Sequence, residues 1–286
     1  MTEPLFSPWE PRAGAADADR GASRRDPGLP PVPTGLPEDV DAPDDPAEFP
    51  ADPEAKRRAD PRWQIAEQVA AAVVRRWPAE VRAVGVHGSL AHGDDRETSD
   101  VDIVVVTYKA GTGPTPDSRR IDGVMVDLGV IGADEYLSHA RTLSTQWPLV
   151  ADQYLTTAPL HDESGWHSVL RDTHLGRLAE ATGREFATLA RSAWCTSAAL
   201  LERSVRLGEW YDTDGALLAL VEARRAAAIT AGLLDRTYFR SSIDGVRRAG
   251  LAGADRATVR ERLAEQAEEL DRRGRPVDGS VDDLLG

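Results

Sequence analysis

The sequence predicts an α+β fold, in which a domain of strands and helices precedes an all-helical domain. Strand-like apolar runs separated by turn residues occur up to residue 131, whereas the chain after Pro159 has a helical texture. A third observation is the run 85–107, GVHGSLAHGDDRETSDVDIVVVT, in which two carboxylates lead into an apolar strand. We expect three regions: an N-terminal tail over 1–60, a catalytic domain over 61–162 and a helical substrate and dimerisation domain over 163–286.

The first 60 residues differ in composition from the rest of the chain. They hold fourteen acidic residues against seven basic ones, and twelve of the nineteen prolines, with few large apolar side chains. Such a segment buries too little apolar surface to offset its ordering entropy. We therefore predict that residues 1–60 form a disordered acidic tail.

The elements of the first domain follow from periodicity and turn residues. Ile65, Val69 and Val73 recur at helical spacing, while Val124 and Val126 alternate with other residues as in a strand. Gly, Pro and Ser mark the connecting loop. The expected order is a helix over 61–77, a strand over 81–88, a helix start at GSLAHG, a strand over 100–107, a loop over 109–120, a strand over 120–131 and a helix over 133–145.

The second half of the chain shows no further strand pattern. Long stretches rich in Ala, Leu and Arg have the composition and spacing of amphipathic helices. We expect helices over 184–210, 214–239 and 255–274.

Composition narrows the classes of function. The net charge is −14, which argues against a nucleic-acid partner, whose phosphates favour a basic surface, and suits a cationic small molecule better. Cys195 is the single cysteine, so an intrachain disulfide and a multi-cysteine metal site are excluded. No apolar run reaches the roughly 18–20 residues that cross a bilayer. The N-terminus also lacks a secretory pattern, so we expect a cytoplasmic protein with no membrane partner.

Three aspartates define the candidate catalytic site. Asp100 and Asp102 lie two residues apart at a strand start, so their side chains point to one face, and Asp127 interrupts the next strand. If the two strands are neighbours, the carboxylates converge, and like charges so close together need a cation. Carboxylate oxygens favour Mg²⁺. We predict that Asp100, Asp102 and Asp127 are catalytic residues and metal ligands.

Gly88 and Ser89 supply the second half of the site. Glycine allows close approach of the backbone, serine offers a hydroxyl, and the helix start presents free N–H groups to a phosphate. A phosphate cradle beside a carboxylate metal site is typical of phosphoryl or nucleotidyl transfer. The structural alternative is that Asp100 caps a turn, Asp102 pairs with an arginine and Asp127 is an exposed strand residue.

These motifs resemble the signature of the DNA polymerase β-like nucleotidyltransferase superfamily, which is an apolar residue, Gly-Ser, a spacer, Asp-x-Asp and a later strand carboxylate. In this sequence the signature reads His87-Gly88-Ser89, Ser99-Asp100-Val101-Asp102 and Val126-Asp127-Leu128. The resemblance implies a nucleotidyltransferase domain with a mixed sheet and flanking helices. It also implies nucleotide binding by Gly88, Ser89 and Ser99.

Further segments narrow the resemblance. STQWPLVADQYLTTAPLHD, GEWYD and AGLLDRTYFRSSIDGV are similar to segments that occur in the same order in the kanamycin (aminoglycoside 4′) nucleotidyltransferases. This similarity implies AMP transfer from Mg-ATP to an aminoglycoside hydroxyl, and hence antibiotic resistance. It also implies a helical C-terminal domain and a homodimer whose active sites draw on both subunits.

The sequence departs from that family at two catalytic positions. The family has a glutamate base and a phosphate-binding lysine four residues apart, and aligning GEW places Val205 and Glu209 there. Glu202, one turn before Val205, is a candidate general base, although an i,i+4 ion pair with Arg206 is a competing explanation. Asp127 is a second candidate for accepting the proton. The chain has two lysines, so arginine would have to serve the phosphates.

Three functions are compatible with these observations. The first is Mg-dependent AMP transfer from ATP to a small hydroxylated, cationic acceptor, with an aminoglycoside as the leading candidate. The second keeps this chemistry and changes the acceptor to another small molecule or a protein side chain. The third is a nucleotide-binding protein without catalysis, which the loss of the expected glutamate and lysine favours and the three aspartates oppose.

Overall fold

The structure is a computed structural model that describes residues 60–96 and 98–285, and all of these belong to one compact unit of the chain. The predicted tail therefore lies outside the described residues, except for Asp60, whose side chain caps the first helix. Within this part of the chain no helix is both long and apolar enough to span a membrane. The strands are β1 (Val81–His87), β2 (Val101–Thr107), β3 (Asp117–Ile121), β4 (Val124–Gly132) and β5 (Ala158–His161). The helices are α2 (Pro61–Arg76), α3 (Gly88–His92), α4 (Ala133–Ala140), α5 (Trp147–Thr156), α6 (Trp166–Glu180), α7 (Gly183–Glu209), α8 (Thr213–Asp235), α9 (Ser242–Arg248), α10 (Arg256–Arg272) and α11 (Val281–Leu285).

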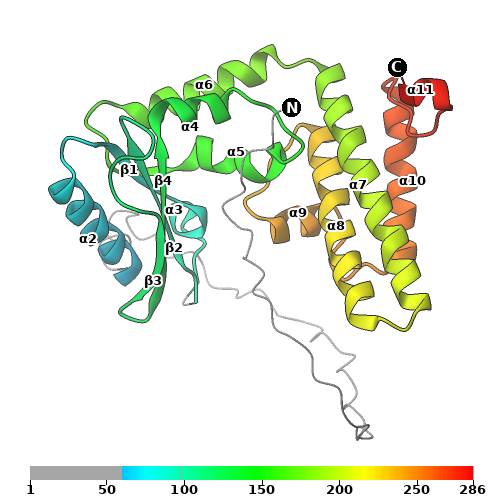
Figure 1. The fold of residues 1–286 in the computed structure, drawn as a ribbon, viewed down its shortest axis with the longest axis horizontal. Coiled ribbons are helices and arrows are strands. Elements are labelled where there is room, and N and C mark those ends of the chain that lie inside the picture. The colour runs from blue at the N-terminus through cyan, green and yellow to red at the C-terminus, as the bar shows by residue number, and fades with distance from the viewer. Residues whose placement is uncertain (1–59, 97, 286) are drawn as a thin grey trace, which may run out of the picture. The chain divides into compact units, whose positions relative to one another are not determined.

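The strands form one mixed sheet in the order β3-β4-β2-β1-β5. β2 and β4 run parallel, and the other three pairs are antiparallel (Figure 1). Helices flank this sheet, and helices alone follow it from α6 onward. The predicted α+β fold is therefore confirmed.

The strand predicted over 120–131 is in fact a hairpin. β3 and β4 pair in antiparallel register around Asp122 and Gly123, whose φ angles are 48° and 86°. Asp-Gly is favoured in two-residue hairpin turns because both turn residues need positive φ. β3 takes up the end of the segment predicted as a loop over 109–120. The correction places a further strand at the edge of the sheet, next to Asp127.

Two other boundaries differ from the expectation. The helix predicted over 133–145 ends at Ala140, and the separate helix α5 begins at Trp147. The short strand β5 pairs with β1, although the sequence from Pro159 onward had been interpreted as helical. Four residues that include a proline carry too little alternation to be recognised as a strand.

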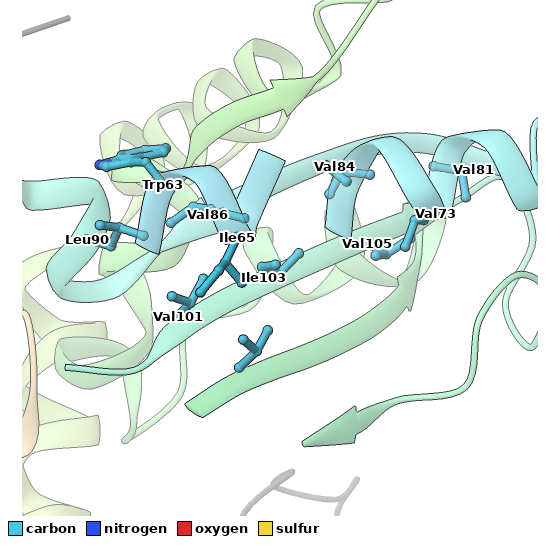
Figure 2. Close-up of a cluster of buried hydrophobic side chains, with 13 residues drawn as sticks. Trp63, Ile65, Val73, Val81, Val84, Val86, Leu90, Val101, Ile103 and Val105 are labelled. Atoms are coloured by element: carbon cyan, nitrogen blue, oxygen red, sulfur yellow. The ribbon is translucent and has the colours of Figure 1, made fainter. Parts of the chain in front are cut away.

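One face of the sheet packs against α2. Ile65 and Val73 of α2 meet Val84 of β1 and Val101 and Ile103 of β2 in a single buried cluster. Figure 2 shows α2 lying over these strands with its apolar side chains directed toward them. The apolar positions of α2 thus anchor the sheet from this side.

The opposite face packs against α4, α5 and α6. Tyr136 from α4, Tyr154 from α5 and Trp166 and Leu170 from α6 are buried against Val104 and its neighbours on the sheet. The first turns of α6 thus pack on the sheet, although α6 follows the domain boundary predicted at residue 162. That boundary stays a prediction.

The helical region is built around α7 and α8, which pack along each other. α10 packs on both of them, and α9 packs on α8. The predicted helices over 184–210, 214–239 and 255–274 correspond to α7, α8 and α10. Trp147 at the start of α5 packs edge-on to Phe186 of α7 and joins α5 to this helical core.

Candidate active site

A row of four polar residues crosses four adjacent strands. Ser118 of β3 is opposite Asp127 of β4, Asp127 is opposite Asp102 of β2, and Asp102 is opposite His87 of β1. Residues in register on neighbouring strands share a face of the sheet, and neighbouring strands are about 4.8 Å apart. The strands that carry Asp102 and Asp127 are therefore neighbours, and the two carboxylates lie side by side.

Gly88 brings the backbone of the next turn against this row. It has a φ of 72°, in the left-handed region, and a Cβ added there would lie 2.7 Å from Oδ2 of Asp102. Any side chain would therefore displace the carboxylate, so the site requires glycine at this position. Ser89 follows in the single-turn helix α3, which begins at Gly88 as expected. Its contact with a nucleotide phosphate stays a prediction.

The carboxylates affect one another electrostatically. Burial, together with the nearby charges of Asp100 and Asp127, raises the pKa of Asp102 to about 7. Asp127 accepts a hydrogen bond from the hydroxyl of Ser118, with 2.6 Å between Oγ and Oδ1. Burial lowers the pKa of His87, while the charges of Asp152, Asp127 and Asp100 act in the opposite direction. Negative charge is therefore concentrated at this end of the sheet.

No lysine or arginine in the described part of the chain forms an ion pair with these aspartates. Among the described residues, no lysine or arginine nitrogen lies within 4.0 Å of a carboxylate oxygen of Asp100, Asp102 or Asp127. The structural alternative, in which Asp102 pairs with an arginine, is therefore not supported.

The donor set suits a hard divalent cation such as Mg²⁺. Asp102 and Asp127 lie in register on neighbouring strands, and a divalent cation bound between them would offset the repulsion between their charges. Within residues 60–96 and 98–285, no group of three or more His, Cys, Asp or Glu side chains is placed so that it could hold a metal ion. Mg²⁺ is usually held by one or two carboxylates together with substrate phosphates and water, so a complete protein cluster is not required.

Ser99 has a defined role in the loop before β2. Its hydroxyl accepts a hydrogen bond from the backbone N–H of Arg96 at 2.8 Å, and its own N–H donates to the carbonyl of Arg96 at 2.8 Å. These two bonds close the turn that leads into Asp100. Direct nucleotide binding by Ser99 stays a prediction.

Two polar contacts link the turn after β1 to later parts of the chain. Nε2 of His92 lies 2.9 and 3.0 Å from the two carboxylate oxygens of Asp152 on α5. Asp94 forms an ion pair with Arg240 at 2.5 Å, and Arg240 lies in the segment between α8 and α9. The fold therefore brings an arginine close to the Gly-Ser turn.

Glu202 lies apart from these contacts. It is exposed on α7, and the described residues provide no hydrogen bond or ion pair that joins it to Asp100, Asp102 or Asp127. They also provide no ion pair between Glu202 and Arg206. Its role as general base therefore stays a prediction, as does the homodimer that the resemblance implies.

Sequence reasoning missed Ser118 and Asp152. Ser118 had been assigned to a loop, although its spacing from the Asp122–Gly123 turn was a usable signal for a hairpin strand. Asp152 is 60 residues from His92. No local pattern could have joined these two residues.

Comparison with known proteins agrees with this geometry. Residues 66–147 match the family model of the nucleotidyltransferase domain, and they include β1 to β4 and the three aspartates. This segment is therefore similar to nucleotidyltransferase domains. A search of curated proteins found no match. Among solved structures, a nucleotidyltransferase-like protein from Exiguobacterium sibiricum 255-15 is 12% identical over 72% of this chain and 75% of that chain, with a TM-score of 0.39. So low a TM-score adds nothing to the fold described above.

Proposed function

We propose that the chain transfers AMP from Mg-ATP to a hydroxyl group of a small cationic acceptor, with an aminoglycoside as the leading candidate. The observation that carries this proposal is the register of Asp102 opposite Asp127, with Gly88 folded against Asp102. The position of these residues within the matched nucleotidyltransferase domain supports the same chemistry.

Asp102 and Asp127, which lie in register, would hold the metal together with triphosphate oxygens in this proposal, and Asp100, at the end of the loop before β2, would join them when the nucleotide is bound. When bound, Mg²⁺ neutralises charge on the triphosphate and lowers the pKa of a coordinated hydroxyl group. The three aspartates would also fix the position of the reacting groups near the start of β2. Their unpaired charge favours a bound dication over an empty site.

The other residues of the row have separate tasks. Gly88 and Ser89 would receive the triphosphate, because glycine permits close approach and Ser89 offers a hydroxyl donor. The hydroxyl of Ser118 donates a hydrogen bond to Oδ1 of Asp127 and thereby orients that carboxylate. Asp127 would then accept the proton that the acceptor hydroxyl loses. This division of roles gives the reaction a base without Glu202.

The acceptor is proposed from the charge of the chain and from the resemblance. The chain has a net charge of −14, and an acidic surface concentrates cationic molecules. An aminoglycoside carries several ammonium and hydroxyl groups, and the similarity to kanamycin nucleotidyltransferases favours it over other cations. Adenylylation of such an antibiotic would confer resistance.

A pyrophosphate-release assay tests the proposal. The protein is incubated with Mg-ATP and kanamycin, tobramycin, streptomycin, lincomycin or no acceptor. We expect release with an aminoglycoside, and at least a 1,000-fold loss, about 4 kcal/mol of activation free energy, in Asp102→Asn. Asp117→Asn is the matched control, because Asp117 lies on the opposite face of β3 and pairs with Arg119. It should retain full activity.

Two outcomes would contradict the proposal. Equal release by Asp102→Asn would assign the activity to another site or a contaminant. ATP binding without release for any acceptor would favour a nucleotide-binding protein without catalysis. Release with lincomycin alone would keep the reaction and replace the aminoglycoside with a different acceptor.

A further inference from the structure

A cavity of about 700 Å³ lies at the ends of three helices, and neither Asp102 nor Asp127 lines it. α7 begins there, and α8 and α10 end there. Half of the eight lining residues are arginines, and we call this space the arginine cavity: Arg184, Arg236, Arg273 and Arg275 are its basic residues. Asp235 is the acidic residue in the lining. The concentration of positive charge is unusual in a chain with a net charge of −14.

Two of these arginines are held in place by hydrogen bonds to neighbouring groups. Arg273 donates to Glu269 at 2.5 Å and to the carbonyl of Leu234 at 2.7 Å. Arg275 donates to the hydroxyl of Thr188 at 2.9 Å. These bonds order the side chains before any ligand arrives, which reduces the entropy lost on binding.

Arg236 is ordered by stacking. Its guanidinium carbon lies 5.1 Å from the centroid of the Phe186 ring, a geometry typical of a cation–π contact. A Cβ at Gly183 would lie 3.1 Å from the guanidinium, so glycine at the start of α7 leaves room for it. The stacked guanidinium keeps its N–H donors available in the plane of the group.

The positive charges are only partly compensated. Glu269 is paired with Arg273 and also with Arg272, which is not among the lining residues. Among the described residues, Arg184 and Arg236 have no carboxylate within 4.0 Å. Arg273 bonds to a C-terminal carbonyl of α8 and Arg236 stacks on Phe186, but no described carboxylate pairs with the charge of Arg184 or Arg236. These two arginines therefore point to an anionic ligand.

We propose that the arginine cavity binds a small molecule that carries at least two linked phosphate groups. Arginine guanidinium groups recognise phosphate oxygens through paired N–H donors. The cavity has the size of typical small-molecule sites, about 300–1,000 Å³, so a single phosphate would leave most of it unfilled. The α7 N-terminus, where Arg184 lies, favours an anion, whereas the C-terminal carbonyls of α8 and α10 oppose it, and Arg273 already bonds to one of them, that of Leu234. The proposal does not depend on the transferase activity.

Calorimetric titration with sodium tripolyphosphate, in buffer with EDTA and no magnesium, tests the site on the full chain. We expect Arg184→Gln and Arg236→Gln each to raise the Kd at least fivefold. Arg184 is exposed and has no ion pair within the described residues, so its replacement leaves the fold unchanged and keeps the test valid if Arg236→Gln folds poorly. Arg272→Gln is the matched control and should bind like the unaltered protein. Orthophosphate should bind at least tenfold more weakly than tripolyphosphate.

Three results would overturn the proposal. An equal loss in Arg272→Gln would show a general charge effect. A loss in Ser89→Ala, with both cavity variants unaffected, would place the anion at the Gly-Ser turn. Absence of binding in every form of the protein would show that the cavity is not a phosphate site. None of these results bears on the pyrophosphate-release assay with Asp102→Asn.

Discussion

The two faces of β2 differ at the start of the strand, although both are buried further along it. Val101, Ile103 and Val105 point to one side and are buried against α2. Asp102 points to the other side, opposite Asp127 and beside the Gly88 turn. Because side chains alternate along a strand, residues one position apart belong to different environments. Val104 and Val106 follow Asp102 on its face and are buried against α4, α5 and α6, so a firmly packed strand presents the charge only at its first residues.

This difference separates the residues that stabilise the fold from those expected to act chemically. Burial of apolar surface stabilises the sheet through the α2 face. The charges of Asp100, Asp102 and Asp127 repel one another unless a cation is bound. Substitutions on the two faces of the same strand should therefore differ in whether they change stability or activity.

Ile103→Ala should give the largest change in stability. Ile103 is 1% exposed in the α2-facing cluster, and truncating such a side chain leaves a cavity. We expect the free energy of unfolding, measured by urea denaturation, to fall by about 3 kcal/mol. The rate of the remaining folded enzyme should stay close to that of the unaltered protein. Asp102→Asn is the adjacent control and should be at least as stable as the parent in magnesium-free buffer. Equal stability of the parent, Ile103→Ala and Asp102→Asn would show that the two faces of β2 do not differ in this way.

Ser118→Ala should lower activity without a matching loss of stability. The substitution removes the hydrogen bond that orients Asp127, and we expect kcat to fall about tenfold, or about 1.4 kcal/mol of activation free energy. Because Ser118 is exposed, stability should change by less than about 0.5 kcal/mol. Ser118→Thr keeps the hydroxyl and should retain most of the rate. An unchanged kcat in the alanine variant would remove Ser118 from the site.

The smallest expected effect is the contribution of His174 to the pH dependence of stability. His174 forms a polar contact that is buried on the Asp102 side of the sheet. Its Nδ1–H donates to the carbonyl of Ala140 at 2.8 Å, and its Nε2 accepts from the indole N–H of Trp147 at 3.1 Å. Burial lowers the pKa of His174 below the ordinary 6.5. Between the folded pKa and 6.5 the unfolded chain binds more protons, so the free energy of unfolding decreases as the pH falls through that window.

We expect this loss to reach at most about 1.4 kcal/mol per pH unit from His174, measured by urea denaturation between pH 5 and pH 7. Burial also lowers the pKa values of His87 and His167, which add to the same trend. His174→Gln should therefore show a shallower pH dependence without losing it entirely. Identical slopes for the two proteins would show that His174 does not contribute.

Sequence alone was sufficient where the pattern was local and strong. The alternation in β2 assigned Asp102 to the face opposite Ile103, and the interruption of an apolar run identified Asp127. Helical spacing located α2, α7, α8 and α10. These features depend on residues a few positions apart, which single-sequence periodicity detects.

Features that depend on long-range pairing were missed. The hairpin turn at Asp122–Gly123 lay inside a segment whose overall pattern resembled one strand, so Ser118 was assigned to a loop. The contact of His92 with Asp152 joins residues 60 positions apart. Strand order and register decide such contacts, and a single sequence does not encode them in a local pattern.

The edges of the sheet explain how so apolar a set of strands avoids pairing with a second molecule. A free strand edge is a template for aggregation unless charge, proline or short length blocks it. β3 forms one edge, and its Asp117, Ser118, Arg119 and Arg120 are all exposed and polar. β5 forms the other edge, with four residues that include Pro159, which has no N–H to donate. The hairpin that orients Asp127 therefore also gives the sheet an exposed polar edge, which disfavours pairing with a strand of another molecule.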